Sequence, residues 1–372
     1  MTEIMNIKLK TLTPLWTGGV DDEMDRVHET GIIGSLRWWY EALVRGLGGW
    51  ARDPSQHKCS FDAEKYREST VTDERYRLRN AGLCDACQVF GATGWQRRFR
   101  LTVEDHTERL WTPPPNALNV RPPGRRRGWY LPPGHVGELT IRIQGDQATC
   151  SLLASLFLFL EQWGAIGAKP QLGYGVFRLQ NREALAARAQ DWAWKLVGDD
   201  ELDPTCPDLR RFGFFRFRFS PSTKGWWTRA PGIERLLGRS DMANALRQAV
   251  DREMIPLSPA LKNVWRFDRW QGSRDDEREL FGTAFGRYEP VRSKIVVSWA
   301  YLDGDDWEVR GWVWLPAQTA NGLQQLWDIV RDEATWRKTL NAPAGTLMTV
   351  PDVKTWQAQS VEQVKSFLEV KT

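Results

Sequence analysis

The pattern of apolar and polar positions divides the chain into two similar series of predicted elements. In the first series, alternation with a period of two predicts strands near 5–12, 97–103, 138–144 and 174–180. Apolar positions at helical spacing predict helices over 34–47 and from 146 onward. The resulting order, βαββαβ, is that of a ferredoxin-like fold, the four-stranded arrangement that RNA-recognition domains use.

The same order starts again in the second half of the chain. Strands are predicted over 212–220, 293–302, 307–316 and near 346–350, and helices over 233–254, 257–265 and 321–340. A helical stretch over 181–197 and an acidic, proline-containing segment separate the two series. We therefore expect an α+β chain of two tandem ferredoxin-like domains, residues 1–197 and 211–372, joined by a linker over 198–210.

Short internal matches support a duplication of this fold. GSLRWW at 34–39 is similar to SPALKNVW at 258–265, and QVFGATGW at 88–95 is similar to ELFGTAFGR at 279–287. Both pairs occur in the same order, as expected for two copies of one unit. The first copy carries a longer insertion, over about 48–95.

The segment GIIGSLRWWYEALV at 31–44 combines two glycines, a serine and an aromatic helix. We interpret Gly31 and Gly34 as a turn and Ser35 as the N-cap of the helix that follows. A helix N-terminus offers free backbone N–H groups, which favour a phosphate. The alternative is an ordinary capped amphipathic helix, with Trp39 in the core.

Composition adds a class of partner and a compartment. The chain has 372 residues, a formal charge of +4 and 21 tryptophans, and its longest apolar run, 151–160, is too short to cross a bilayer. With no secretory leader, we expect a cytoplasmic protein. Basic residues interleaved with aromatics favour single-stranded nucleic acid, because phosphates bind cations and bases stack on rings. The alternative is a solvated basic loop on an aromatic-rich core.

The insertion contains a candidate metal site. Cys84 and Cys87 form a CxxC, and His57 and Cys59 lie upstream of it. Three thiolates and an imidazole would form a closed tetrahedral zinc site, which is structural and would staple the insertion to the domain. His28 or His106 could replace His57, and the alternative without metal is a set of buried free cysteines.

Two loops carry further candidate chemistry. The glycine-rich segment 163–177 contains Lys169 and allows close backbone approach to a phosphate, or packing against its neighbours. The proline-rich stretch 111–136 is expected to project as a stiff basic thumb over an RNA strand, with arginines 125–127 at its tip. A solvated loop is the alternative for this stretch.

Four motifs together resemble one protein family. The motifs that carry the resemblance are TPLWTGG, DRVHETGIIGSLRWWYEALVRGLGG, GLCDACQVFGATGWQRRFRL and GAIGAKPQLGYGVF. With them, the chain resembles the RAMP superfamily of CRISPR proteins, in particular the double-RAMP subunits of type III-B (Cmr) effector complexes. The resemblance implies an RNA-binding subunit of an antiviral ribonucleoprotein that grips the 3′ region of the guide RNA or the guide–target duplex. The implied partners are CRISPR guide RNA, target RNA and other Cmr-type RAMP subunits.

The resemblance also implies which residues face RNA. They lie in the segment 31–37, in the glycine loop and among the basic residues. With their neighbours, the candidates are Thr17, Gly18, Gly19, Arg26, Gly31, Gly34, Ser35, Arg37, Arg97, Arg98, Arg125, Arg126, Arg127, Lys169, Gln171, Gly173 and Tyr174.

We do not expect the chain to be an enzyme, although one loop carries candidate catalytic groups. Asp21, Asp22 and Asp25 lie beside His28, and a carboxylate with a divalent ion could activate a ribose 2′-OH. The resemblance implies a family in which backbone subunits cut target RNA with an aspartate in this loop. The alternative functions are therefore an endoribonuclease, for guide maturation or target cleavage, and a scaffold that contacts only protein.

Overall fold

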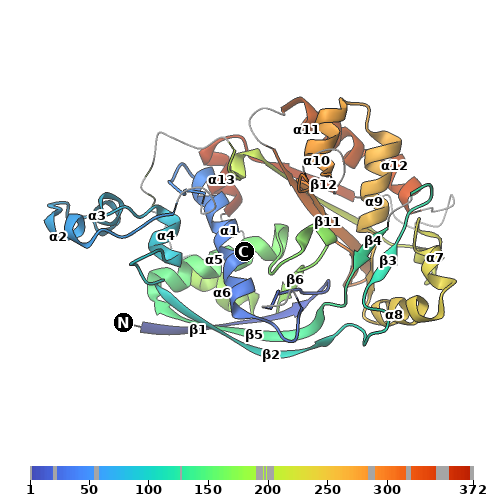
Figure 1. Ribbon diagram of the computed structural model, residues 1–372, viewed down its shortest axis with the longest axis horizontal. Helices are drawn as coiled ribbons and strands as arrows, with labels where there is room; N and C mark the ends of the chain where they lie inside the picture. Colours follow the sequence, from blue (N-terminus) through green and yellow to red (C-terminus); the bar gives the residue numbers. More distant parts are fainter. Residues whose placement is uncertain are drawn as a thin grey trace.

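The computed structural model describes residues 2–19, 23–53, 58–125, 128–189, 196, 198, 205–283, 290–315, 320–340 and 352–368. Its first sheet contains β1 (Thr2–Thr11), β2 (Phe99–Arg109), β5 (His135–Asp146) and β6 (Phe177–Leu179). The strands are antiparallel in the order β2-β5-β1-β6, and α1 (Glu29–Gly46) and α5 (Gln147–Trp163) cover one face (Figure 1). The predicted βαββαβ unit is therefore confirmed for this first half of the chain.

The second sheet repeats this topology. It contains β7 (Phe212–Phe219), β8 (Met254–Ile255), β9 (Ile295–Val297), β10 (Ala300–Asp303), β11 (Asp306–Trp314) and β12 (Asp352–Gln357). The order is β12-β7-β11-β10-β8, and β9 also pairs with β11, so β9 and β10 share the place of one interrupted strand. Counted in this way, four strands of the second sheet follow the order of the first, β8 adds an edge strand, and the prediction of two tandem ferredoxin-like domains is confirmed.

The helices of the second half differ in detail from the predicted ones. The helix expected over 233–254 consists of α7 (Glu234–Leu237) and α8 (Ser240–Asp251), and the last helix expected consists of α11 (Ala320–Arg331) and α12 (Glu333–Thr339). The short helix α9 (Ser258–Val264) continues as a π-helical turn, Trp265–Arg269. Two helices were not predicted, α10 (Arg274–Phe281) and α13 (Val361–Leu368).

Between the two halves, α6 (Arg182–Ala189) begins the predicted helical stretch. Most of 190–204, and with it most of the predicted linker, lies outside the described residues, as does the strand expected near 346–350. No helix in the described part of the chain combines the length and apolarity that crossing a bilayer requires.

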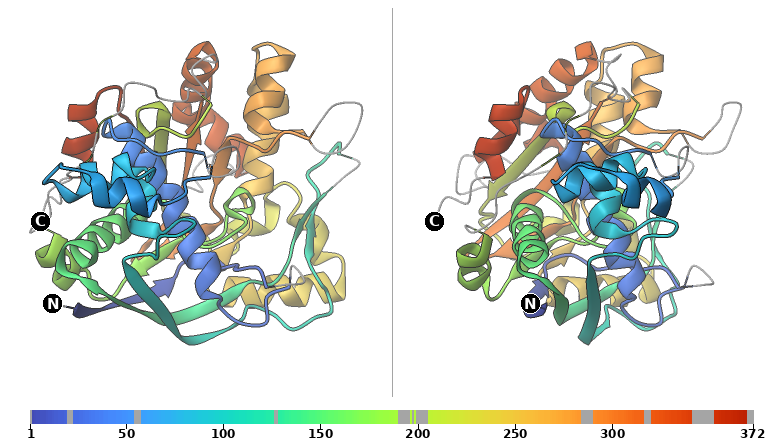
Figure 2. Two further views of the ribbon diagram at one scale, coloured as in Figure 1. Left: turned by 60° about the vertical axis from the view of Figure 1, so that its left-hand side comes forward. Right: turned by 90° about the vertical axis from the view of Figure 1, so that its left-hand side faces the viewer.

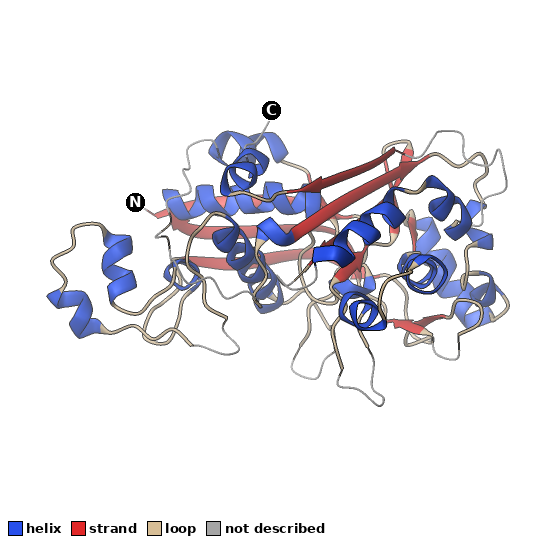
Figure 3. Cartoon of the chain, turned by 90° about the horizontal axis from the view of Figure 1, so that it is seen from above, coloured by secondary structure: helices blue, strands red, loops and turns tan. Residues whose placement is uncertain are grey.

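The insertion and the thumb leave the first half in different directions. The helices α2 (Ala63–Glu68) and α3 (Glu74–Asn80) extend away from the body, and α4 (Asp85–Phe90) returns to α1 (Figures 1 and 3). The thumb contains the hairpin β3 (Leu118–Val120) and β4 (Trp129–Leu131), which packs on α7 and α8 of the second half (Figure 2). The base of this hairpin is packed, because Leu118 and Val120 are fully buried, and residues 126–127 of the predicted cationic tip lie outside the described residues.

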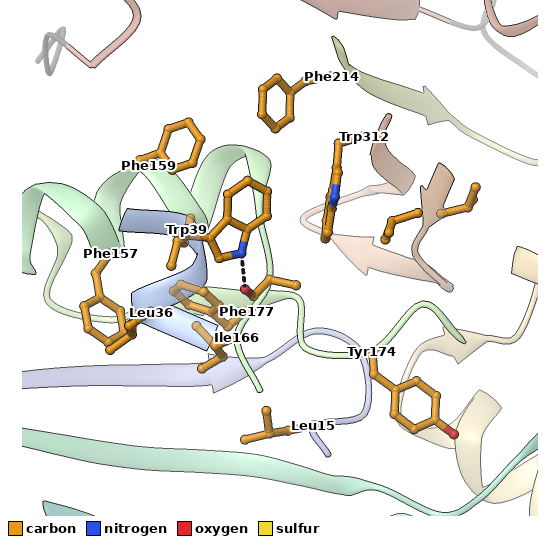
Figure 4. Close-up of a cluster of buried hydrophobic side chains, with 14 of the residues drawn as sticks. Leu15, Leu36, Trp39, Phe157, Phe159, Ile166, Tyr174, Phe177, Phe214 and Trp312 are labelled. Atoms are coloured by element: carbon orange, nitrogen blue, oxygen red, sulfur yellow. Dashed lines mark hydrogen bonds between the residues drawn. The ribbon is translucent and has the colours of Figure 1, made fainter. Parts of the chain in front are cut away.

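Buried charges and aromatic rings join the two halves. Arg310 of β11 donates to the carbonyl oxygens of Glu161 and Phe177, and Arg178 of β6 pairs with Asp303 of β10. Trp39 of α1 lies 5.7 Å from Phe159 of its own half and 5.0 Å from Trp312 of the second half, between ring centroids (Figure 4). Because a buried charge without partners is costly, these contacts fix one relative placement of the halves.

Candidate nucleic-acid interface

The helix α1 begins earlier than the sequence pattern predicts. Its first residue is Glu29, and His28 occupies the N-cap position without a side-chain cap. Gly31, Gly34 and Ser35 are therefore helical, and the predicted glycine turn and the predicted N-cap role of Ser35 are both wrong. The glycines did not stop the helix because Glu29 places a negative charge in its first turn and tertiary packing outweighs intrinsic propensity.

The same three residues still connect the helix to its surroundings. A Cβ at Gly31 would lie 2.9 Å from the Cβ of Thr17, so glycine permits close packing there. A Cβ at Gly34 would meet no atom within 4 Å. The hydroxyl of Ser35 donates to the Ile32 carbonyl and accepts a 2.9 Å hydrogen bond from the N–H of Gly167. Ser35 thus holds the glycine loop against α1.

The glycines of the loop are required by contacts within the protein. Gly167, Gly173 and Gly175 all have positive φ. A Cβ at these positions would lie 2.5 Å from the Trp16 carbonyl oxygen, 2.8 Å from the Trp299 nitrogen and 2.0 Å from the Ile166 carbonyl oxygen, respectively. The packing alternative therefore accounts for these three glycines.

The remaining candidates in this loop divide into buried and accessible positions. Tyr174 is 1% exposed and its hydroxyl donates to the Pro132 carbonyl, so its side chain cannot contact a ligand in this structure. Lys169 has a left-handed backbone with φ 60°, and Gln171 is exposed. The Gln171 carbonyl accepts a 3.0 Å hydrogen bond from the buried Lys262 of α9. Lys169 and Gln171 therefore form the open edge of the loop.

This edge borders a pocket of about 680 Å³ between the two halves. The walls come from α1, the glycine loop, the segment 291–296 and β11. The lining residues are Ser35, Trp38, Trp39, Ala165, Gly167, Ala168, Lys169, Pro170, Gln171, Val291, Arg292, Ser293, Lys294, Val296, Trp312 and Trp314. They include four tryptophans and three cations, and none of these described lining residues is acidic.

The three cations differ in how they are held. The Lys169 ammonium lies 3.8 Å from the centroid of the Trp16 ring. Lys294 is paired with Glu279 at 2.7 Å, whereas Arg292 is exposed. Charges of one sign in a concave, partly apolar site attract an anionic ligand more strongly than the same charges on an open surface.

The other predicted RNA contacts do not converge on this pocket. Gly18 and Gly19 lie in the connection between β1 and α1, with the Gly19 N–H donating to the Glu23 carbonyl. Beside them, Thr17 is buried and its hydroxyl accepts from the His28 N–H. Arg26 pairs with Glu29 at 3.0 Å. These residues hold the start of α1 in place.

Several basic candidates outside the pocket contact other residues of the protein. The Arg97 guanidinium lies 5.9 Å from the Phe99 ring, and Arg98 donates to the Gln88 carbonyl. Arg125 donates to Asn263 of α9 and stacks on the Phe267 ring. Arg126 and Arg127 lie outside the described residues.

Arg37 has a structural position that the sequence did not indicate. Its guanidinium contacts the Glu41 carboxylate at 2.8 Å, the Gly91 carbonyl at 3.2 Å and the Cys87 sulfur at 3.2 Å. It therefore joins α1 to the end of α4, beside the cysteines, and does not face the pocket.

The cysteine cluster forms as predicted for three of its members. The sulfur atoms of Cys59, Cys84 and Cys87 lie within 4.8 Å of one another and are buried, an arrangement that can hold a metal ion. His57 lies outside the described residues. Neither His28 nor His106 belongs to the cluster that the described residues form. Three converging sulfurs are the donor set that zinc prefers in structural sites.

The acidic loop offers one described pair. His28 Nε2 lies 2.6 Å from Asp25 Oδ1, and this hydrogen bond lowers the pKa of the Asp25 carboxyl. Asp21 and Asp22 lie outside the described residues. The pair lies near the start of α1 and does not line the pocket.

Sequence reasoning missed the walls that come from the second half. Trp312 and Trp314 are two residues apart on β11, a spacing that puts both side chains on one face of a strand. That spacing is the one sequence signal that could have indicated two tryptophans on the same side of the pocket. The position of Arg292 and Lys294 opposite the glycine loop follows only from the docking of the two halves, which no local pattern encodes.

Comparisons with known proteins give a family model and several solved structures that match the chain. Residues 8–178 match the family model of the RAMP superfamily. Among solved structures, the chain is similar to Cmr1 from Pyrococcus furiosus in its apo form, at 14% identity and TM-score 0.38, covering 85% of this chain and 89% of that one. A chain of a type IV-B CRISPR complex matches at 15% identity and TM-score 0.31, covering 54% of this chain and 95% of that one. Cmr6 from Pyrococcus furiosus matches at 16% identity and TM-score 0.24, covering 48% of this chain and 99% of that one. No curated protein gives a significant match.

Proposed function

We propose that this chain, whose residues 8–178 belong to the RAMP superfamily, is an RNA-binding subunit of a type III-B (Cmr) CRISPR effector complex. The observation that carries the proposal is the pocket between the halves, with its cations and tryptophans and no acidic residue among the described lining. Cations contact phosphates and aromatic rings stack on bases, which is the combination that unpaired RNA requires.

The partners follow from this role. The chain grips the 3′ region of the guide RNA or the guide–target duplex near the end of a cytoplasmic particle and docks against other Cmr-type RAMP subunits. Guide and target pairing supplies sequence specificity, and the protein holds backbone and shape.

The open face of the first sheet is the competing RNA surface. RNA-recognition domains bind bases with aromatic side chains on this face. Here the exposed positions of β1 include Lys8 and Lys10, and Ile4 is the large exposed hydrophobic residue on the described strands of that sheet. Without exposed aromatic rings on those strands, this face lacks the stacking platform, and the pocket is favoured.

Matched double variants distinguish the two surfaces. Lys169→Gln with Arg292→Gln removes two positive charges at the pocket, and Lys8→Gln with Lys10→Gln removes two from the sheet face. Binding of labelled single-stranded RNA is measured by anisotropy across a series of salt concentrations. The pocket variant should reduce the slope of log K against log salt by roughly 1.4, about 0.7 per lost phosphate contact. An equal or larger effect of the sheet variant contradicts the proposal.

We further propose that the cysteine cluster holds a structural zinc ion. Cys59, Cys84 and Cys87 would be three of its ligands, with His57 as the predicted fourth. Zinc would supply a rigid junction between the insertion and α1, where Arg37 places a positive charge beside the Cys87 sulfur.

We propose no catalytic role for the chain, and any RNA cleavage belongs to other subunits. The specific alternative is an endoribonuclease using Asp25 and His28, which are within hydrogen-bond distance. The purified chain is incubated with labelled guide or target RNA and a divalent ion. The RNA should remain intact. Cleavage that is lost in Asp25→Asn would favour the enzyme instead.

A further inference from the structure

We infer that a phosphate group binds in a small basic pocket between the insertion and α1, beside the cysteine cluster. This insertion pocket has a volume of about 200 Å³ and is lined by Arg37, Arg52, Lys58, Cys59, Cys87, Ala92 and Thr93. It is separate from the pocket between the halves. Arg37 and Ser35, which line one pocket each, lie two positions apart on α1 and therefore point to nearly opposite sides of the helix. Phosphate binding here does not depend on the proposed contacts with RNA.

The size of the insertion pocket favours a small ligand. Its volume is below about 300 Å³, the lower end of the range for pockets that enclose drug-sized molecules. A water molecule takes up about 30 Å³ in the liquid, so the pocket has room for a group of a few heavy atoms with part of its hydration. A tetrahedral oxyanion fits this space, whereas a base with its sugar requires a larger one.

The charge of the lining favours an anion. Arg37, Arg52 and Lys58 contribute three cations, and none of the described lining residues is acidic. Glu41 pairs with Arg37 at 2.8 Å, and a zinc ion held by three thiolates carries one net negative charge. These two negative charges leave one of the three cations uncompensated. Arg52 and Lys58 are exposed, and neither forms an ion pair with a described residue.

The protein fixes the positions of the two arginines. The Arg37 guanidinium contacts the Cys87 sulfur at 3.2 Å, so this arginine already compensates the sulfur that it touches. The Arg52 guanidinium lies 4.7 Å from the centroid of the Trp50 ring, and its carbonyl accepts a 3.2 Å hydrogen bond from the buried Arg45. Donors that are held in place lose less conformational entropy when a ligand binds. The pocket is therefore preorganised for an anion beyond what the cysteines require.

The directions from which the donors approach favour phosphate over carboxylate. The lining comes from three segments, namely α1, the start of the insertion and its end at residues 92–93, and Thr93 adds a hydroxyl to the cations. A phosphate presents oxygens in several directions, whereas a carboxylate presents two in one plane. A phosphate bound here bridges α1 and both ends of the insertion.

Two sources can supply this group. Inorganic phosphate can occupy the pocket by itself, and a phosphate of an RNA backbone can enter it from a bound strand. In both cases the ligand binds the folded chain and not the unfolded one, because the lining segments come together only on folding. Phosphate should therefore raise the temperature of unfolding.

The test follows thermal unfolding of the full chain in increasing inorganic phosphate, with the ionic strength held constant by chloride. Phosphate should raise the unfolding temperature more than chloride does. Arg52→Gln with Lys58→Gln should weaken phosphate binding roughly 10-fold or more, the effect of losing one charged hydrogen bond. The matched control is Lys65→Gln with Arg67→Gln, which removes the same charge from exposed positions of α2 outside the pocket and should leave phosphate binding unchanged.

A second measurement identifies the source of the phosphate. Binding of labelled single-stranded RNA is measured by anisotropy for the unaltered chain and for both double variants. If phosphate stabilises the chain through the pocket, a loss of RNA affinity in the pocket variant alone assigns the site to a backbone phosphate. An unchanged RNA affinity assigns it to free phosphate. Unfolding without phosphate checks that each variant folds, and Lys58→Gln alone replaces the pocket variant if that one is unstable.

Three results would overturn the phosphate site. The first is that phosphate stabilises the unaltered chain no more than chloride does. The second is an equal response of the two double variants, which would mean that phosphate acts without a specific site. The third is stabilisation by poly-glutamate and not by phosphate, which would make the pocket a docking site for an acidic protein segment. The proposed function is tested by variants of the other pocket, so each can fail without the other.

Discussion

The two halves of the molecule share one contact, in which an arginine binds the carbonyl of the glycine that ends a helix, before the next strand. We call this contact the joint. In the first half, Arg37 donates to the carbonyl of Gly91, and in the second half Arg266 donates to that of Gly282. The two glycines have nearly equal dihedral angles, φ 89° and ψ 160° against φ 79° and ψ 163°. The match between QVFGATGW and ELFGTAFGR therefore places two equivalent glycines, and each of them accepts a hydrogen bond from an arginine of the preceding helical segment.

The difference between the joints is what surrounds them. Arg37 is separated from its glycine by 54 positions and Arg266 by 16, because the first half carries the insertion with the cysteine cluster. The second joint has no such cluster among the described residues, and the segment after it, 291–296, lines the pocket. On the proposed function, one scaffold serves metal binding in the first copy and RNA binding in the second, so the proposed roles differ through the residues around the joint.

The largest expected effect is on stability and comes from removing a cysteine beside the first joint. Cys84→Ala should abolish zinc binding and lower the free energy of unfolding by several kcal/mol, because metal binding contributes directly to folding. Cys150→Ala, a fully buried cysteine in α5, is the matched control and should keep the zinc. Zinc content per chain and denaturant unfolding measure both effects. Equal behaviour of the two variants would count against the metal site.

The next effect tests whether the two arginines are equivalent. Arg37→Met and Arg266→Met each remove charged hydrogen bonds and should destabilise the fold by about 1.5–3 kcal/mol. The loss should be larger for Arg37, because the Glu41 side chain it pairs with is only 5% exposed, against 22% for Glu277 beside Arg266. Urea unfolding measures both. A neutral Arg266→Met variant would show that the second joint does not depend on this contact.

A smaller effect concerns the contact between the halves through Lys262. Burial lowers the pKa of this lysine from 10.5 to about 7. The unfolded chain then binds more protons between these values, so stability rises as the pH increases from 7 to 10. Lys262→Met removes the cost of burying the amine and should stabilise the protein by about 1–3 kcal/mol near pH 6.

The pH dependence provides the control for this variant. The difference between Lys262→Met and the unaltered chain should shrink towards pH 10, where only the hydrogen bond to the Gln171 carbonyl is lost. Unfolding at pH 6 and pH 9.5 measures it. An equal difference in unfolding free energy at both pH values would mean that burial does not lower the pKa of Lys262.

The smallest effect separates the two glycines of α1. Gly34→Ala should stabilise the protein by about 0.5–1 kcal/mol, because its Cβ would point into open space within a helix. Gly31→Ala should destabilise it, since its Cβ would lie 2.9 Å from Thr17. Thermal unfolding measures both. If Gly34→Ala weakens RNA binding while stabilising the fold, the predicted close approach of RNA at Gly34 is supported.

Much of the fold could be predicted from local patterns. Strict alternation in β7, the predicted hairpin around residues 303–306 and the repeated order of elements indicated two ferredoxin-like units. The boundaries of α1 could not be predicted in the same way. Gly31 and Gly34 suggested a turn, but Gly31 allows close contact with Thr17, a long-range reason for glycine that no local rule contains.

The site was predictable only in part. The spacing of Cys84 and Cys87, with Cys59 upstream, correctly indicated a buried group of sulfurs that can hold a metal ion. Arg37 and Tyr174 were assigned to RNA, yet one is engaged beside the cysteines and the other is buried. Trp314 was not assigned because the pocket exists only where the two halves meet.

The most direct test of the central claim is photo-crosslinking of the full chain to single-stranded RNA containing 4-thiouridine, with mass spectrometric identification of the linked peptides. The account predicts crosslinks in residues 163–178 and 290–315, the two segments that face each other across the pocket. Crosslinks confined to β1, β2 and β5 would place RNA on the open face of the first sheet and would contradict it.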